Sequence, residues 1–180
     1  MDSPRLIIAS VRMPVSLKRT EDGSAWDVRM SPGGLATALR AVAAKRDFTW
    51  VGWPGAEVPG REREEVVEQL SHQTDAVPVF IDSDQYEGFY EQFSNRVLWP
   101  LFHNLPQPQE FSQDAWNDYQ AVNQRFADTI AEQVRPGDSV WVHDYQLALV
   151  PRMLRQRGID CSIGYFLHIP FPSSETYRAL

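Results

Sequence analysis

The stretch that decides the fold is WVHDYQLALVPRMLRQRGIDCSIGYFLHIPFPSSE, which runs from Trp141 to Glu175. Its pattern predicts two strands, a helix between them and a stiff loop after them: strand 139–142, helix Leu147–Arg157, strand 162–167 and the proline-bracketed loop that follows. The polar residues His143, Asp144 and His168 fall at the carboxyl ends of the two strands. In an open α/β sheet, ligands bind at that edge. The stretch therefore predicts a parallel sheet and the location of its site.

The same alternation continues toward the N-terminus. Short apolar runs predict three more strands, over 5–10, 48–53 and 77–81. Amphipathic spacing predicts three more helices: 35–42, 86–103 with a break at Pro100, and 116–134 with a stop at Pro136-Gly137. Two segments lack such spacing: 11–32, a predicted loop or small flap, and 54–65, a predicted solvated loop that runs into a surface helix. Alternating strands and helices of these lengths predict a doubly wound, Rossmann-like α/β domain with a parallel sheet.

Charge and length restrict the classes of function. The chain has 180 residues, so one domain is expected, and its net charge of −7 argues against nucleic acid as a general partner. An anionic substrate would need locally placed positive charge. Of the 17 basic residues, only Lys18 and Lys45 are lysines. That bias favours bidentate recognition by arginine, although a GC-rich genome produces the same bias.

The N-terminal residues and the single cysteine bear on the compartment. Cys161 lies in an apolar strand pattern and is expected to be a buried, inert thiol. The first residues have no basic or apolar region typical of a secretory signal, and no apolar run is long enough to span a bilayer. We therefore expect a cytoplasmic protein without a membrane partner.

Two features near the N-terminus are candidates for binding an anion. Arg12 directly follows the first predicted strand, where its forked guanidinium suits a phosphate; a surface arginine paired with a carboxylate is the alternative. Gly33 and Gly34 open a predicted helix, so backbone N–H groups there can approach an anion. A simple turn is the alternative, because neither a GxGxxG fingerprint nor a P-loop is present.

Other candidate residues admit a structural and a functional interpretation. Tyr90 and Trp99 belong to an aromatic cluster that either fills the core or lies against a sugar face. Asp144 either orients a sugar hydroxyl or caps the helix that begins near Gln146. His168 follows an apolar strand, as a structural hydrogen-bonding residue or as a catalytic one. No histidines or carboxylates have metal-ligand spacing, so we expect neither a metal nor a cofactor.

Taken together, the motifs resemble one family, the trehalose-6-phosphate synthases, which are retaining glycosyltransferases of the GT-B architecture. The matching motifs occur in family order and cover most of the chain: SVRMP (10–14), SPGGL (31–35), YEQFSNRVLWPLFH (90–103), WVHDYQL (141–147) and FLHIPFPSSE (166–175). The combination of these motifs is far more specific than any one of them. The family joins glucose from a nucleotide donor, commonly UDP-glucose, to glucose-6-phosphate, and it forms α,α-trehalose 6-phosphate.

The resemblance implies a set of residues for the acceptor sugar phosphate. By this resemblance, Arg12 binds the phosphate of glucose-6-phosphate, and Tyr90 lies on the phosphate side. Trp99 shapes the acceptor pocket, and Asp144 contacts the acceptor sugar. The family usually has asparagine where this chain has Val11, so a side-chain amide is lost beside the arginine.

The resemblance also implies residues for the donor. Gly33 and Gly34 match the pair that contacts the nucleotide sugar, and His168 matches the histidine near the donor glucose. Asp144 and His168 are thus the implied catalytic residues. In the usual proposal for retaining enzymes of this kind, the leaving phosphate takes the acceptor proton, so no protein nucleophile is needed.

The resemblance further implies that residues 1–180 are an N-terminal, acceptor-side domain that ends in an incomplete helix. The family's C-terminal donor-binding domain is absent from this sequence. We therefore expect a fragment or half of a split enzyme, inactive without that domain or a partner chain. A homo-oligomer is a further expectation. A stand-alone, non-catalytic sugar-phosphate-binding module or degenerate remnant is the alternative. A transferase with a cyclitol-phosphate acceptor is a third hypothesis.

Overall fold

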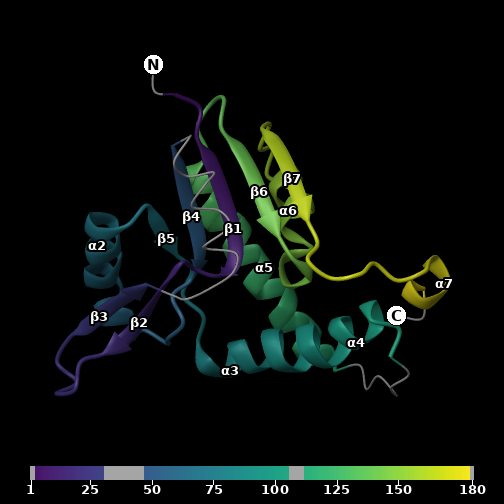
Figure 1. The fold of residues 1–180 in the computed structure, drawn as a ribbon, viewed down its shortest axis with the longest axis horizontal. Coiled ribbons are helices and arrows are strands. Elements are labelled where there is room, and N and C mark those ends of the chain that lie inside the picture. The colour runs from purple at the N-terminus through teal and green to yellow at the C-terminus, as the bar shows by residue number, and fades with distance from the viewer. Residues whose placement is uncertain (1–2, 31–46, 106–111, 179–180) are drawn as a thin grey trace.

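A five-stranded parallel sheet forms the centre of the computed structural model, which describes residues 3–30, 47–105 and 112–178. The strands of this sheet are β1 (Leu6–Arg12), β4 (Phe48–Trp53), β5 (Ala76–Pro78), β6 (Ser139–His143) and β7 (Ser162–Phe166). Their order is β5-β4-β1-β6-β7 (Figure 1). The chain thus builds outward from β1 in one direction and then in the other, which is the Rossmann arrangement. The predicted doubly wound α/β fold is confirmed.

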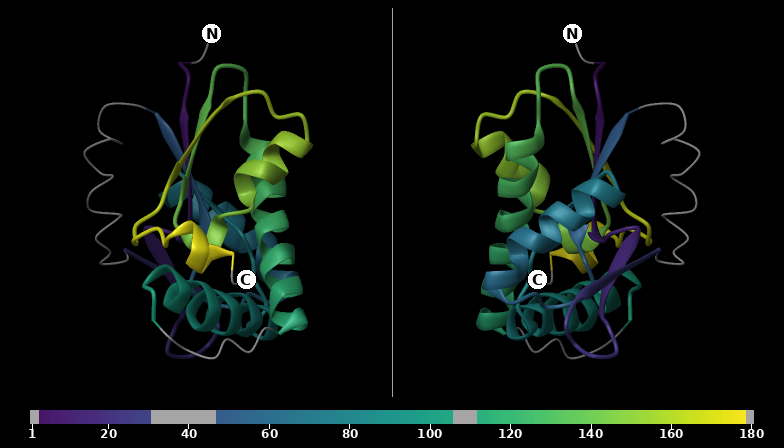
Figure 2. Two further views of the ribbon diagram at one scale, coloured as in Figure 1. Left: turned by 90° about the vertical axis from the view of Figure 1, so that its right-hand side faces the viewer. Right: turned by 90° about the vertical axis from the view of Figure 1, so that its left-hand side faces the viewer.

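Alternating side chains on β1 supply both faces of the sheet. Ile7 and Ala9 pack in the cluster that contains buried residues of the helices α5 (Gln113–Gln133) and α6 (Val150–Gln156). Ile8 packs on the other face with Val66 and Leu70. Because successive residues of a strand point to opposite faces, one apolar run can serve two cores. Figure 2 shows α5 and α6 (green) together on one side of the strands.

Helices and short helical turns connect these strands. Two of them cover the first face, α5 (Gln113–Gln133) and α6 (Val150–Gln156). Others are η1 (Gly60–Glu62), α2 (Arg63–Gln73), η3 (Tyr145–Leu147) and, after β7, α7 (Ser174–Tyr177). The Ser112 hydroxyl caps α5 by accepting from the Ala115 N–H. Gly158 closes the turn after α6 at φ +75°, a conformation that favours glycine. The predicted long helix, the stop before Pro136 and the surface helix after residue 62 are confirmed.

The segment predicted as a loop or small flap contains a β-hairpin. Strands β2 (Val15–Arg19) and β3 (Trp26–Met30) pair antiparallel and lie beside α2 (Figure 1). Glu62 anchors the hairpin, because it accepts hydrogen bonds from the Arg19 guanidinium and from Trp26 Nε1, the latter at 2.9 Å. The Arg19 guanidinium also lies 4.0 Å from the centre of the Trp26 ring. The flap is therefore present, but its two strands are not predicted from the sequence.

One continuous helical segment crosses the carboxyl edge of the sheet (Figure 1). It consists of α3 (Ser83–Tyr86), the wide-turned helix η2 (Glu87–Leu98) and α4 (Trp99–Phe102). The predicted break at Pro100 is wrong. The Trp99 N–H bonds the carbonyl of Ser94, five residues earlier, and such wide turns make room for a proline ring that would crowd an ordinary helix.

A buried ion pair ties the start of β1 to the start of β6. The Arg5 main-chain N–H donates to Asp138 Oδ1 at 2.8 Å, and its guanidinium donates to Oδ2 at 2.9 Å. Asp138 is only 4% exposed. Burial opposes the charge of Asp138, but hydrogen bonds from Arg5 and Arg135 hold its pKa below the usual value. The pair joins residues 133 positions apart in the sequence.

Cys161 and Val11 lie in positions that differ from what the sequence predicts or implies. Cys161 precedes β7 instead of lying inside it, and it is half-buried, with a thiol whose pKa is raised by burial. Val11 faces the core at 6% exposure, so this position does not contribute a side chain to the carboxyl edge of the sheet. The helix predicted over 35–42 lies outside the described residues.

Candidate functional site

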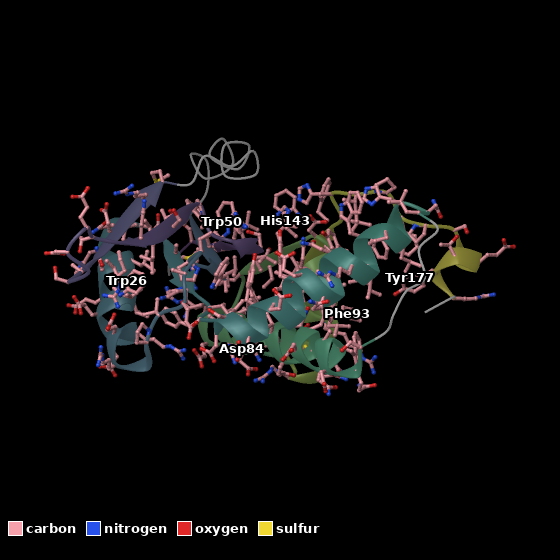
Figure 3. The ribbon with its side chains drawn as sticks, turned by 90° about the horizontal axis from the view of Figure 1, so that it is seen from below. Trp26, Trp50, Asp84, Phe93, His143 and Tyr177 are labelled. Atoms are coloured by element: carbon pink, nitrogen blue, oxygen red, sulfur yellow. The ribbon has the colours of Figure 1, made fainter. Side chains whose placement is uncertain are left out.

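The carboxyl ends of β1 and β6 meet where the direction of strand addition reverses. In doubly wound sheets this switch point is the usual ligand crevice. Arg12 ends β1, while His143 ends β6 and is followed by Asp144. Figure 3 looks onto this edge, with the helical segment running across the view and His143 above it. The fold thus brings the ends of these strands and the helical segment to one edge.

Arg12 stands beside a ladder of aromatic rings. It is exposed and in register with Trp53 on the neighbouring strand. Trp53 stacks on Tyr86 with ring centres 4.4 Å apart, and Tyr86 stacks on Tyr90 at 5.0 Å. Burial raises the pKa of the Tyr86 hydroxyl, and a hydrogen bond with Arg12 opposes that shift. Among the described residues, no carboxylate pairs with Arg12, so its guanidinium is available to an anion.

Asp144 lies in a strained turn between β6 and η3. Its φ of +73° and ψ of 166° belong to a region that residues with a side chain rarely adopt. The Asp144 N–H donates to the carbonyl of Phe166 at 2.7 Å. Its Oδ1 accepts from the N–H of Tyr145 at 3.0 Å and from that of His168 at 3.2 Å. The capping interpretation is therefore correct for Oδ1, and Oδ2 accepts no hydrogen bond from the described part of the chain.

His143 and His168 meet through their ring nitrogens. Nδ1 of His143 lies 3.0 Å from Nε2 of His168. His143 is 2% exposed, whereas His168 is exposed at the edge. Burial, together with the proximity of His168, lowers the pKa of His143 to about 4. His143 is therefore a neutral imidazole at neutral pH, held behind the exposed ring of His168.

Buried polar groups on α5 support the loop that carries Asp144. The Tyr119 hydroxyl donates to the Tyr145 carbonyl at 2.6 Å. The Asn123 amide donates to the carbonyl of Gln146 at 2.9 Å, and its oxygen accepts from the Leu149 N–H at 3.2 Å. Because Tyr119 and Asn123 are at most 1% exposed, these bonds are shielded from water. Helix α5 therefore holds this loop in place through buried hydrogen bonds.

Tyr145 links helix η2 to the turn that contains Asp144. Its hydroxyl donates to Asn95 Oδ1 on η2 at 3.2 Å. Burial raises the pKa of that hydroxyl, and Tyr90 and Asp144 raise it further. Tyr145 therefore lies within electrostatic range of both the aromatic ladder and the strained turn.

The structure groups some of the predicted site residues and separates others. Arg12 hydrogen-bonds Tyr86, which stacks on Tyr90. Asp144 accepts a hydrogen bond from the main chain of His168. Trp99 lies farther along the helical segment, 40% exposed, with its ring stacked on His103 at 4.0 Å. Gly33 and Gly34 lie outside the described residues, so their predicted contact with a donor stays a prediction.

Three residues that complete this arrangement have no predicted site role, although the sequence places His143 at the end of a strand. Trp53 and Tyr86 form the ladder beside Arg12, and His143 holds His168. The position of Trp53 at the end of an apolar strand was an available signal, whereas the pairing of two histidines 25 positions apart was not. Among the described residues, no three or more His, Cys, Asp or Glu side chains gather as metal ligands, and no helix could cross a membrane.

Comparison with solved structures assigns the fold to a class. An E. coli structure described as trehalose-6-phosphate bound with UDP-2-fluoro glucose superposes with a TM-score of 0.72 at 30% identity, over 98% of this chain and 35% of that one. The N-terminal domain of a Candida albicans trehalose-6-phosphate phosphatase superposes with a TM-score of 0.78 at 28% identity, over 99% of this chain and 36% of that chain. The fold is that of the N-terminal domain of GT-B glycosyltransferases.

The sequence comparisons define the family. The model of glycosyltransferase family 20 matches residues 4–180, and the chain belongs to this family. The UDP-forming α,α-trehalose-phosphate synthase 1 of Aspergillus niger is 47% identical over an alignment of 180 positions, which covers 98% of this chain and 35% of that protein. The corresponding enzyme A of Dictyostelium discoideum is 46% identical over 99% of this chain and 24% of its own length. The chain thus spans about a third or less of these relatives.

Proposed function

We propose that this chain is the acceptor-side domain of an α,α-trehalose-phosphate synthase that uses UDP-glucose and glucose-6-phosphate. The observation that carries the proposal is the hydrogen bond of Arg12 with Tyr86, whose ring stacks on Tyr90, at the same sheet edge as Asp144 and His168. A cation free of carboxylate partners in the described chain suits a phosphate, and a carboxylate with one free oxygen suits a sugar hydroxyl. A donor-binding domain, on the same or another polypeptide, would complete the cleft.

In this proposal each residue acts on a defined part of the acceptor. The Arg12 guanidinium binds the phosphate of glucose-6-phosphate by charge-assisted hydrogen bonds, with Tyr90 on the same side. Asp144 Oδ2 accepts from a hydroxyl of the acceptor sugar, which orients its anomeric oxygen. Trp99, Gly33 and Gly34 keep the roles that the sequence predicts for them. His168 lies toward the donor glucose.

The proposed reaction proceeds with retention and without a protein nucleophile. The anomeric oxygen of glucose-6-phosphate forms a bond to C1 of the donor glucose, on the face from which UDP leaves. The bond between C1 and the β-phosphate oxygen breaks, and the departing phosphate takes the acceptor proton. The products are α,α-trehalose 6-phosphate and UDP. Cationic groups that stabilise the developing charge on UDP would come from the donor domain.

A non-catalytic sugar-phosphate-binding module is the second candidate, and one comparison favours it. The similar Candida albicans domain belongs to a protein named a trehalose-6-phosphate phosphatase, so this fold also occurs beside a different activity. Both candidates place glucose-6-phosphate at the same edge, and both fit a cytoplasmic location, where we propose that the protein acts. They differ in whether a donor domain restores turnover.

Calorimetric titration of glucose-6-phosphate into the purified chain tests the shared part of the proposal, with glucose and inorganic phosphate as comparison ligands. We expect glucose-6-phosphate to bind more tightly than either part alone. No binding of any of the three would contradict the acceptor assignment. Co-expression with the C-terminal part of a similar synthase then separates the two candidates. Formation of UDP supports the enzyme, and binding without turnover supports the module.

A further inference from the structure

The contact between His143 and His168 joins a buried ring to an exposed one. His143 ends β6 and pairs with Phe166 on β7, so His168 lies two residues beyond the pairing partner. The nitrogen atoms His143 Nδ1 and His168 Nε2 are 3.0 Å apart, and the two ring planes are inclined by 26°. At this distance one nitrogen must donate a hydrogen to the other.

Apolar aromatic rings lie beside His143. The ring centre lies 4.5 Å from that of Trp141 and 6.2 Å from that of Phe166. Its second nitrogen, Nε2, is buried and has no hydrogen-bond partner among the described residues. The pKa of His143, lowered to about 4 by burial and by His168, keeps the ring neutral at neutral pH. A neutral imidazole carries a single N–H, which lies either on Nδ1 or on Nε2.

The environment distinguishes the two tautomers. With the hydrogen on Nε2, a donor would be buried in the apolar pocket without an acceptor in the described chain. With the hydrogen on Nδ1, the donor is satisfied by His168, and only a lone pair remains unpaired. Buried donors are seldom left without a partner, so the Nδ1–H form is favoured. His168 must then keep Nε2 free of hydrogen and carry its own hydrogen on Nδ1.

We propose that His143 is a positioning residue that donates its Nδ1–H to His168 and so fixes His168 as a neutral Nδ1–H donor. The nitrogen that His168 offers to a ligand is then a hydrogen-bond donor suited to a sugar hydroxyl oxygen. That this ligand is the donor glucose rests on the proposed function. The tautomer itself does not, because it is set by the protein without any substrate.

Long-range ¹H–¹⁵N NMR correlations of the histidine rings test the tautomers in the ligand-free, ¹⁵N-labelled chain at neutral pH. The expected result is a protonated Nδ1 and a bare Nε2 in both His143 and His168. A protonated Nε2 in His143 would overturn the proposal. The chain has four histidines, and replacing each in turn assigns the signals. Because no substrate is present, this outcome is independent of whether the chain supports trehalose-phosphate synthesis.

Two variants separate positioning from simple packing. His143→Asn keeps an N–H donor near the place of Nδ1, whereas His143→Phe fills the apolar pocket without a donor. We expect His168 to remain the Nδ1–H tautomer in the first variant and to become a mixture of tautomers in the second. His72→Asn, at an exposed position on α2, should leave the His168 signals unchanged. Equal His168 spectra in the Asn and Phe variants would contradict the proposal. If a variant does not fold by circular dichroism, the unsubstituted chain decides.

Discussion

The main-chain N–H of His168 donates to the Oδ1 atom of Asp144 over 3.2 Å and ties the end of β7 to the end of β6. The Asp144 N–H makes the reciprocal link to the Phe166 carbonyl at 2.7 Å. This geometry holds the backbone of Asp144 at φ +73°, a strained conformation that normally requires glycine. Strain at the proposed ligand-binding edge supports a functional role for the carboxylate.

Replacing Asp144 separates its backbone strain from its function. Asp144→Gly and Asp144→Ala both remove the carboxylate, but only glycine relieves the strain. We expect the glycine variant to be more stable than the alanine variant by about 1–2 kcal/mol, even though glycine gains entropy when unfolded. Urea unfolding measures the difference. The control is Ala148→Gly, at an exposed residue with an ordinary φ of −63°, which should destabilise the chain instead. A more stable alanine variant would argue against strain at Asp144.

Removing the Arg12 guanidinium should weaken binding of glucose-6-phosphate. We expect Arg12→Ala to cost about 1.5–3 kcal/mol of binding free energy, the range for a charge-assisted hydrogen bond. Calorimetry measures this cost. Lys18→Ala, which removes an equal charge from an exposed position on β2, is the matched control and should bind normally. An unchanged affinity of the Arg12 variant would remove Arg12 from the site.

The stability of the chain should depend on pH through His143. Its pKa of about 4 in the folded chain lies below the ordinary value of 6.5, so the unfolded chain binds a proton first as the pH falls. Unfolding is therefore favoured progressively between pH 6.5 and pH 4, by up to about 3 kcal/mol from this residue. Urea unfolding across this range measures the slope. His143→Phe should show a shallower slope than the unsubstituted chain, and His72→Asn an unchanged one. Parallel slopes for His143→Phe and the unsubstituted chain would refute the assignment.

Gly88 allows helix η2 to approach α5. A Cβ atom at this position would lie 2.0 Å from Oδ2 of Asp118 and 3.0 Å from its Cβ. Rotation of Asp118 relieves the first contact but not the second, so Gly88→Ala should cost about 1–3 kcal/mol. Thermal unfolding measures the effect. Gly60→Ala is the control, because an added Cβ there meets no atom within 4 Å. Equal stabilities of the two variants would mean that η2 and α5 can move apart at no cost to accommodate the added methyl group.

Hydrophobic periodicity predicted the sheet well, because parallel strands buried on both faces produce continuous apolar runs. The strand over 48–53 has the predicted bounds, and the helix around Phe126 is present. The hairpin was missed because its strands are short and half-polar, so alternation such as Val15, Leu17 and Arg19 is weak. The helix passes through Pro100 because wide turns accommodate the ring, a property of hydrogen bonding that residue spacing does not reveal.

Of the candidate site, the sequence predicts only the residues that directly follow an apolar strand. Arg12 and Asp144 could be located because polar residues that follow apolar strands stand out. The contact of His168 with His143 depends on the register of β6 and β7, and the ladder of Trp53, Tyr86 and Tyr90 depends on how a helix crosses the sheet edge. Register and crossing geometry arise from packing between distant segments, which one sequence does not encode locally.

The central position of β1 also affects the order of events during synthesis. Arg5 is made 133 residues before its partner Asp138. At roughly 5–20 residues per second, the ribosome needs on the order of ten seconds to supply that partner. During this interval the apolar run of β1 has no β6 to pair with, and the sheet closes only by joining the ends of a long loop. Nascent chains of this protein should therefore leave one edge of β1 unpaired until β6 emerges.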